Sequence, residues 1–276
     1  MPAESAKRKA YDTDLTDEQW AVLAPLLPRE VVGGRHRSVD LREVLNAMFY
    51  RLRSGCAWRL LPHDLPPKST VFEYFSAWRN DGTWQAIHET LAQAVRVAAG
   101  REPAPSATIL DSQSVKTSEV PSQRGYDAGK KVKGHKRHLL VDTLGLVMVV
   151  VVTAASVQDR DGAKLVLARM RHTARLQKIW ADGGYAGQLI TWVRDNFGWD
   201  LEIKKRPEEK GFHLIKHRWI VERTFGWLGR YRLLAKDYAA TIASSEAEIH
   251  LAMTHLMLNR LTHQVPENEY KFASAA

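Results

Sequence analysis

Apolar residues in the first hundred positions recur every three or four residues, which is the spacing of helices that bury one face. Thr16 and Gln19 have the spacing of a capping box at the start of a first helix. Asp40 and Glu43 open a second helix in the same way, and Gly55 ends it. The chain is therefore expected to begin with short, capped helices.

Two further helices are predicted before residue 100. Thr70 and Glu73 open the third helix, which a glycine turn ends, and the fourth covers about 84–98. Short helices joined by tight turns are typical of a helix-turn-helix-like DNA-binding domain, in which the helix at 70–79 would read DNA. A small helical bundle fits the same pattern equally well. The net charge of residues 1–100, only +1, is low for a DNA-binding domain.

After residue 106 the apolar positions take the spacing of β-strands. Strands are predicted at 107–115 and within 137–154, where a turn at 142–145 divides a hairpin. Helices and strands then alternate, at 161–171, 178–185, 186–196, 199–206 and 213–230. This order implies an α/β sandwich with a mixed sheet, followed by a further helix at 244–262.

The predicted elements divide the chain into five parts. A loose N-terminus at 1–14 precedes a helical accessory or DNA-binding domain at 15–99. A linker at 100–106 leads into the α/β domain at 107–262, and 263–276 form a tail.

The composition is that of an ordinary globular protein, with 45% hydrophobic and 26% charged residues among 276. Cys56 is the one cysteine, which excludes an intramolecular disulfide and a cysteine-cluster metal site. The first residues lack the apolar core of a signal peptide, and the longest apolar run, 144–155, is too short to cross a bilayer. We therefore expect no membrane role and a cytoplasmic location.

The charge is strongly basic and unevenly distributed. The whole chain carries +9, and residues 101–276 account for +8 of it. A sequence pI near 9.6 is typical of proteins that bind nucleic acid, because cationic side chains displace the counterions of the phosphates. A basic surface that only keeps the protein soluble is the alternative.

Two aspartates stand where predicted strands end. Asp111 is in phase with Ile109 and so shares its face of the sheet, whereas Asp182 precedes Gly183 and Gly184. Sites in open α/β sheets form at the carboxyl ends of strands, which favours a functional role for both carboxylates. Each aspartate taken alone is equally typical of a turn.

Glu222 is the third acidic candidate. On a helix of 100° per residue, Glu222 and Arg218 fall within the arc of Val221 and Phe225. A charged pair on an apolar face must be paired, bound to metal or placed at a cleft, because a buried, uncompensated carboxylate is costly. A surface ion pair between residues i and i+4 is the alternative.

A run of basic residues with interleaved glycines covers 116–137 and is predicted to be a flexible loop that grips the DNA backbone. Its expected DNA contacts are Lys130, Lys131, Lys133, Lys136 and Arg137. Arg223 and Arg230 extend the same track, with Trp219 and Trp227 packing beside them. A solvated basic loop is the alternative.

Zinc and a fourth acid are weaker hypotheses. The pairs His135 with His138 and His213 with His217 lack a third ligand, so zinc is not expected. Asp159 and Asp161 bracket a helix start, where capping explains at least one of them.

Several motifs, in this order, resemble those of bacterial insertion-sequence transposases of the DDE class, and most closely insertion-sequence family five. The three acidic motifs are ILDSQSVK at 109–116, WADGGYAG at 180–187 and RWIVERTFGWLGRYRLLAKDY at 218–238. The run at 125–145 and the N-terminal stretches at 15–28 and 53–62 are similar as well, so the likeness covers about 14–262.

The resemblance implies a ribonuclease H-like catalytic core preceded by a small all-α domain, with Asp111, Asp182 and Glu222 as a metal-binding catalytic triad. The family's third motif also implies DNA contact by Arg218. Its tyrosine and lysine positions hold Ile215 and Gly229 here, with Arg230 one residue further on.

The expected function is that of a DNA transposase. It would bind the terminal inverted repeats of its element, cut at the element ends and join the 3′-hydroxyls to target DNA. Two Mg²⁺ ions, or Mn²⁺ in their place, suit in-line displacement at phosphorus and prefer carboxylate oxygens. A homo-oligomer acting at the bacterial nucleoid is expected, because two ends must be held together. The alternatives are an inactive DNA-binding copy and a nuclease of the same fold.

Overall fold

The computed structural model describes residues 8–30, 38–118, 123–170, 174–204 and 217–262. The predicted tail, the first half of the predicted loose N-terminus (1–7) and the beginning of the predicted helix at 213–230, with Ile215, lie outside these ranges. Within them, no helix has both the length and the apolar character needed to cross a bilayer.

The N-terminal region consists of helices, as predicted. Its α-helices are α1 (Asp17–Leu23), α2 (Leu41–Ser54), α3 (Lys68–Asn80) and α4 (Thr83–Ala98), with 3-10 turns η1 (Ala24–Leu26) and η2 (Trp58–Leu60). The capping box of Thr16 and Gln19 is formed, and Gly55 ends α2 with φ 73°. The prediction that Thr70 opens α3 is wrong. The helix begins at Lys68, and its N-cap residue is Pro67. Proline is tolerated there because the N–H groups at the start of a helix have no partner within the helix.

A six-stranded mixed sheet follows. Its strands are β1 (Ala107–Lys116), β2 (Gly125–Asp127), β3 (Val132–Asp142), β4 (Val147–Ala154), β5 (Lys178–Ala181) and β6 (Asp200–Ile203). The order is β2-β3-β1-β5-β6, and β4 also pairs with β3. β1 is antiparallel to β3 and parallel to β5, which is parallel to β6. The hairpin turn predicted at 142–145 joins β3 to β4.

The basic run at 116–137 is only partly a loop. It contains β2, and β3 begins at Val132 rather than at residue 137. Gly134 explains the difference in part, since a Cβ there would lie 2.0 Å from the carbonyl oxygen of Val115 on β1. The glycines that predicted flexibility therefore also permit close strand pairing.

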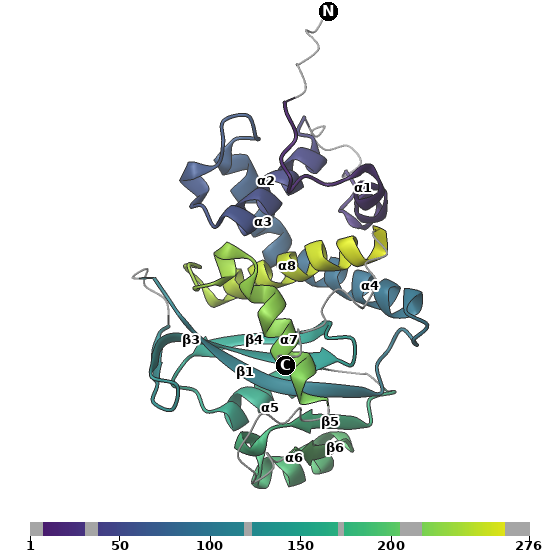
Figure 1. The fold of residues 1–276 in the computed structure, drawn as a ribbon, viewed down its shortest axis with the longest axis vertical. Helices are drawn as coiled ribbons and strands as arrows, with labels where there is room; N and C mark the ends of the chain where they lie inside the picture. Colours follow the sequence, from purple (N-terminus) through teal and green to yellow (C-terminus); the bar gives the residue numbers. More distant parts are fainter. Residues whose placement is uncertain (1–7, 31–37, 119–122, 171–173, 205–216, 263–276) are drawn as a thin grey trace, which may run out of the picture.

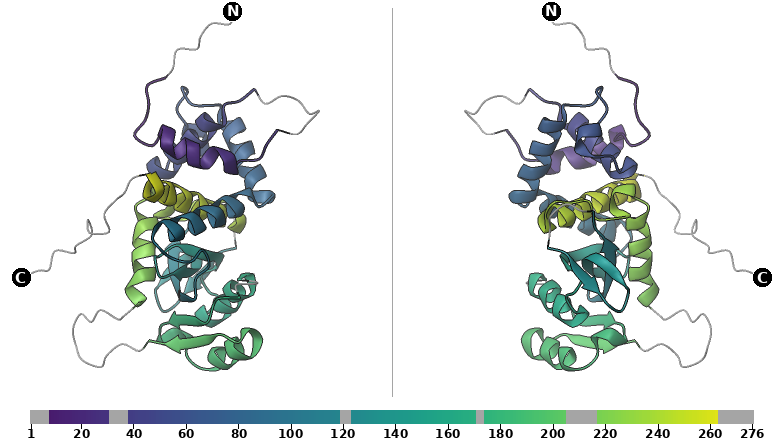
Figure 2. Two further views of the ribbon diagram at one scale, coloured as in Figure 1. Left: turned by 90° about the vertical axis from the view of Figure 1, so that its right-hand side faces the viewer. Right: turned by 90° about the vertical axis from the view of Figure 1, so that its left-hand side faces the viewer.

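The sheet separates two layers of helices (Figure 1). On one face lie α5 (Asp159–Arg169), the turn η3 (Gly183–Tyr185) and α6 (Gln188–Phe197). The other face carries α7 (Arg218–Gly229) and α8 (Ile242–Thr262), which the turn η4 (Arg232–Leu234) connects. Figure 2 shows α4 and α8 side by side between the sheet and the other N-terminal helices.

The two faces of the sheet have separate hydrophobic cores. Leu110, Leu140 and Val151 face α5 and α6. Ile109 and Leu139 point the other way, into a core that continues through α7 and α8 to α1–α4. The N-terminal helices and the sheet therefore share one core, although 101–106 between them hold neither helix nor strand.

Candidate active site

Asp111 lies in β1, and Asp182 lies directly after the neighbouring parallel strand β5. Ile109 of β1 pairs with Trp180 of β5, and each aspartate stands two residues further on. Adjacent strands are about 4.8 Å apart, so this register brings the two carboxylates together. Both line one recess, in which Arg218 and Lys204 supply positive charge.

Local backbone groups orient both carboxylates. The N–H of Ser112 donates to Asp111 Oδ1 at 2.7 Å. The N–H of Gly184 donates to Asp182 Oδ1 at 2.8 Å, in the glycine turn that follows β5. Asp111 shares the face of Ile109, as the sequence predicts, and α7 covers this face.

Asp111 is in an environment that favours its neutral form. Burial, with a further contribution from the negative charge of Asp182, raises the pKa of Asp111 to about 6, although Lys130 and Arg218 oppose the rise. Two adjacent carboxylates with this excess of negative charge are suited to a divalent cation, and their hard oxygens are the ligands that Mg²⁺ prefers.

Glu222 lies on α7 and faces solvent, with 54% of its side chain exposed. The prediction that it points toward the apolar arc of the helix is wrong. The buried side of α7 is formed by Ile220, Val221, Thr224, Phe225, Trp227 and Leu228. Glu222 instead forms the alternative i,i+4 ion pair with Arg218, at 3.2 Å.

Arg218 links the third acid to the first two, because it also lines their recess. Among the described residues, no three His, Cys, Asp or Glu side chains lie close enough to hold a metal ion. The structure thus brings Asp111 and Asp182 together and leaves Glu222 beside Arg218. The role of all three as a metal-binding triad stays a prediction.

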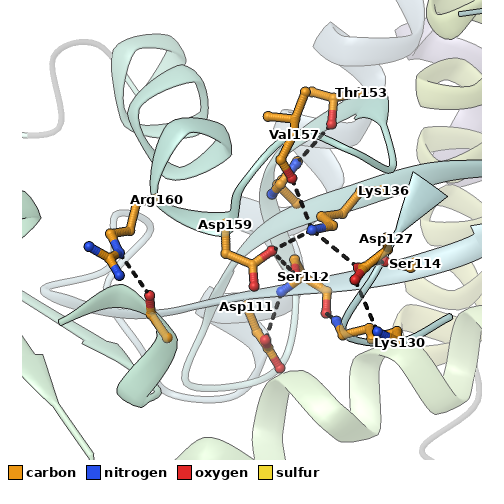
Figure 3. A network of polar contacts seen from close by, with 12 residues as sticks. Asp111, Ser112, Ser114, Asp127, Lys130, Lys136, Thr153, Val157, Asp159 and Arg160 are labelled. Carbon is orange, nitrogen blue, oxygen red and sulfur yellow. Dashed lines mark hydrogen bonds and ion pairs between the residues drawn. The ribbon is translucent and has the colours of Figure 1, made fainter. Parts of the chain in front are cut away.

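Lys136 and Arg137 are buried, which contradicts the prediction that they contact the DNA backbone. Lys136 Nζ lies 3.0 Å from Asp159 and 3.2 Å from Asp127 (Figure 3). Arg137 is 1% exposed and donates to the carbonyl of Leu234. Both belong to β3, whose central position in the sheet encloses them.

Lys130, Lys131 and Lys133 remain exposed. Lys130 Nζ donates to the carbonyl of Ser112, next to Asp111, at 3.0 Å. This contact directs a cationic side chain from the β2–β3 turn toward the carboxylate recess.

Asp159 is part of the polar network beside the recess. The expectation that Asp159 or Asp161 caps α5 is wrong, since the N-cap is Gln158. Asp159 instead accepts a hydrogen bond from the Ser112 hydroxyl at 2.8 Å and pairs with Lys136. Figure 3 shows this network reaching from Asp159 toward Asp111.

Tyr185 lies close to the acidic residues of the site, although the sequence did not indicate it as a site residue. Burial raises its pKa well above the usual value, and the charges of Asp111, Asp159 and Asp182 raise it further. Its position directly after the Asp-Gly-Gly turn was the available signal, because that turn folds the ring back toward the acidic residues.

The histidines considered for zinc have other partners. His135 lies 2.9 Å from Asp237, and His138 contacts the hydroxyl of Thr153 at 3.0 Å. His213 is outside the described ranges. Arg223, midway along α7, and Arg230, directly after its end, line a separate groove with the buried Trp227.

Comparison with known proteins identifies related sequences. Residues 102–258 match the family model "Transposase DDE domain", and 15–88 match "Putative transposase of IS4/5 family". A DDE domain implies a ribonuclease H-like core, which confirms the expected fold class. No solved structure shows significant similarity to this chain.

Two proteins of Burkholderia cepacia are similar over part of their length. The "Putative transposase for insertion sequence element IS402" is 31% identical over 131 residues, 45% of this chain and 60% of that protein. The "Insertion element IS402 uncharacterized 16.2 kDa protein" is 33% identical over 91 residues, 30% of this chain and 61% of that protein. The chain thus spans about three fifths of both relatives. Since the DDE model alone covers more than half of the sequence, the chain belongs to the DDE transposases of insertion sequences, of the IS4/5 type.

Proposed function

We propose that this chain is a DNA transposase that binds the terminal inverted repeats of its element, cuts at the element ends and joins the 3′-hydroxyls to target DNA. The observation that carries the proposal is the pair of carboxylates in one recess, with Asp111 in β1 and Asp182 directly after the adjacent parallel strand β5. Family membership supports DNA as the substrate.

Asp111, Asp182 and Glu222 are the residues that would hold two Mg²⁺ ions, or Mn²⁺ in their place. Bound divalent ions supply activation of the attacking oxygen and stabilisation of the leaving oxygen in displacement at phosphorus. The raised pKa of Asp111 supports this assignment, because a nearby cation offsets the cost of keeping that buried carboxylate ionised.

The cationic residues around the recess position the DNA. Lys130, Lys131 and Lys133 are exposed in or beside the β2–β3 turn, where they contact phosphates without reading sequence. Arg218 stands between Asp182 and Glu222 and attracts the phosphodiester toward the carboxylates. The protein acts as a homo-oligomer that holds two element ends, in the cytoplasm at the nucleoid.

The test is strand transfer of a labelled inverted-repeat end in Mg²⁺ by the wild type and by Asp182→Asn. The amide keeps the size of the side chain and removes its charge, so strand transfer is expected to fall by about 100-fold or more. Asp195→Asn is the matched control, because Asp195 is exposed on α6 and pairs with its neighbour Arg194.

Equal strand transfer by the wild type and Asp182→Asn would contradict the proposal. Cleavage without joining would instead identify a nuclease, and binding without cleavage an inactive copy. Thermal unfolding of each variant separates a lost active site from a lost fold.

A further inference from the structure

A second basic site lies between the N-terminal helices and the pair α7 and α8. It is a groove of about 680 Å³ at the opposite end of α7 from the carboxylate recess. Four arginines line it. Arg53 belongs to α2, Arg223 to α7 and Arg260 to α8, and Arg230 directly follows α7. Since these positions are far apart in sequence, only the folded chain assembles the cluster.

Aromatic rings hold the guanidinium groups in this groove. Arg223 and Arg260 lie over the ring of Trp227, at 4.6 and 4.4 Å from its centre. Both also donate to the carbonyl oxygen of Leu144, at 3.3 and 3.4 Å. Arg53 lies over Tyr231 at 5.6 Å. Like charges held this close repel one another, and an anion in the groove would relieve that repulsion.

The described lining of the groove has more basic than acidic residues. Among the described residues that line it, the acidic ones are Asp12 and Asp14, and the basic ones are four arginines. Asp14 is already paired with Arg8, at 2.8 Å. Burial lowers the pKa of His255, which also lines the groove, to about 4, so this ring is neutral at physiological pH. Guanidinium groups in such a setting bind phosphate well, because their planar donors match its oxygens.

The surface of α7 between the two basic sites is open. Gly226 and Gly229 are exposed and follow Glu222 at helical spacing. Apart from the helix's own backbone, no described atom lies within 4 Å of a Cβ added at either glycine. Gly229 is the last residue of α7, where glycine is common, but Gly226 lies inside the helix, where glycine costs about 1 kcal/mol relative to alanine. No packing requirement within the described structure explains Gly226. Close approach of a ligand backbone does explain Gly226.

We propose that the groove binds the phosphate backbone of duplex DNA at a second point, on the same duplex whose end lies at Asp111 and Asp182. This inference rests on the proposed function and adds a site that includes Arg53 and Arg260. The twelve residues of α7 span about 18 Å. For a duplex that runs along α7, with 3.4 Å per nucleotide on one strand, the groove contacts phosphates roughly five nucleotides from the scissile bond.

The first test measures how binding depends on salt. The probe is a 30-base-pair duplex that ends in the inverted repeat flanking the coding sequence, and divalent ions are omitted so that no cleavage occurs. Arg53→Gln and Arg260→Gln are each expected to reduce the slope of log K against log salt by about 0.9 for a lost phosphate contact, and affinity at 0.15 M salt by about fivefold.

Arg194→Gln is the matched control, because it removes the same charge from an exposed position of α6. Thermal unfolding shows whether each variant is folded. A folded Arg53→Gln and a folded Arg260→Gln that both match Arg194→Gln in slope and affinity would overturn the proposal.

The second test locates the contact on the DNA. A series of duplexes carries one uncharged methylphosphonate at successive positions from the cleaved end. Weaker binding of the wild type is expected for substitutions roughly four to six nucleotides from that end, and Arg260→Gln is expected to lose this sensitivity. Identical profiles for the two proteins would contradict a backbone contact in the groove.

The two proposals fail separately. Strand transfer retained by Asp182→Asn would contradict the transposase chemistry and leave the binding result intact. Loss of strand transfer in Asp182→Asn together with an unchanged salt slope in Arg53→Gln and Arg260→Gln would contradict the groove alone.

Discussion

At the scale of single residues, the charged groups inside this protein are stabilised by specific partners. Asp142, at the end of β3, is fully buried and accepts the N–H groups of Leu144 and Leu146 at 2.9 and 2.8 Å. It also forms an ion pair with Arg96 of α4. One carboxylate therefore closes the β3–β4 turn and connects the sheet to an N-terminal helix.

Asp142→Asn is expected to lower the free energy of unfolding by about 3–5 kcal/mol, because the guanidinium of Arg96 would stay buried without a counter-charge. Denaturant titration measures the change. Asp161→Asn removes an exposed carboxylate that lies 3.9 Å from Lys164 and should change stability by less than about 0.5 kcal/mol. A similar small effect of both substitutions would show that the Arg96 pair does not stabilise the fold.

Among the elements, α7 has one buried side and one side that is open to a ligand. Its buried side packs against the sheet and α8, and its open side carries Glu222, Gly226 and Gly229. The recess with Asp111 lies at its beginning and the arginine groove near its end. A single helix thereby sets the spacing between the two proposed DNA contacts.

Gly226→Ala is expected to raise the free energy of unfolding by about 0.5–1 kcal/mol, since alanine favours the helix and the added methyl group meets no described neighbour. DNA binding should weaken at the same time if the backbone approaches this side. Gly145→Ala gives the opposite sign, because φ there is +80° and the new Cβ would lie 2.8 Å from Trp227. Destabilisation by Gly226→Ala would contradict an unobstructed face.

At the scale of the whole molecule, the helices and the sheet are fastened by buried contacts between distant segments. Arg51 of α2 forms a buried ion pair with Glu248 of α8 at 3.0 Å, and the ring of His88 in α4 lies 4.8 Å from that of His250 in α8. Burial lowers the pKa values of four histidines, which are His88, His138, His250 and His255. Burial disfavours the protonated, charged form of each ring, so the folded protein binds these protons only at lower pH than the unfolded chain does.

The free energy of unfolding is therefore expected to fall as the pH drops from about 6.5 toward 4. In that range the unfolded chain binds protons at these histidines and the folded chain does not. His255→Gln should reduce the loss by up to about 3 kcal/mol, because its folded pKa is about 4. Urea unfolding at several pH values measures this, with the exposed His63→Gln as control. An unchanged pH dependence in His255→Gln would contradict the assignment.

Local interactions could be predicted because their partners are close in sequence. The capping box of Thr16, the end of α2 at Gly55 and the turn after Asp142 each depend on residues within four positions. The start of β3 could not be predicted in this way. A lysine such as Lys136 is buried in a strand only because Asp127 and Asp159 neutralise its charge, and the sequence does not show those contacts. Partners that distant leave no periodic signal in the chain.

Apolar periodicity predicted the helical N-terminal region and the alternation of strands and helices after residue 106, because these signals are local, and the acidic motifs indicated the family. The same signals placed Asp111 and Asp182 at strand ends but did not reveal β2 or the start of β3. Which charged side chains are available to a ligand depends on the packing of the folded chain. That packing enclosed Lys136 and Arg137, turned Glu222 toward solvent, and gathered Arg53 and Arg260 beside α7. The reason is that exposure and charge pairing depend on contacts between remote segments, which form only when the layers pack together.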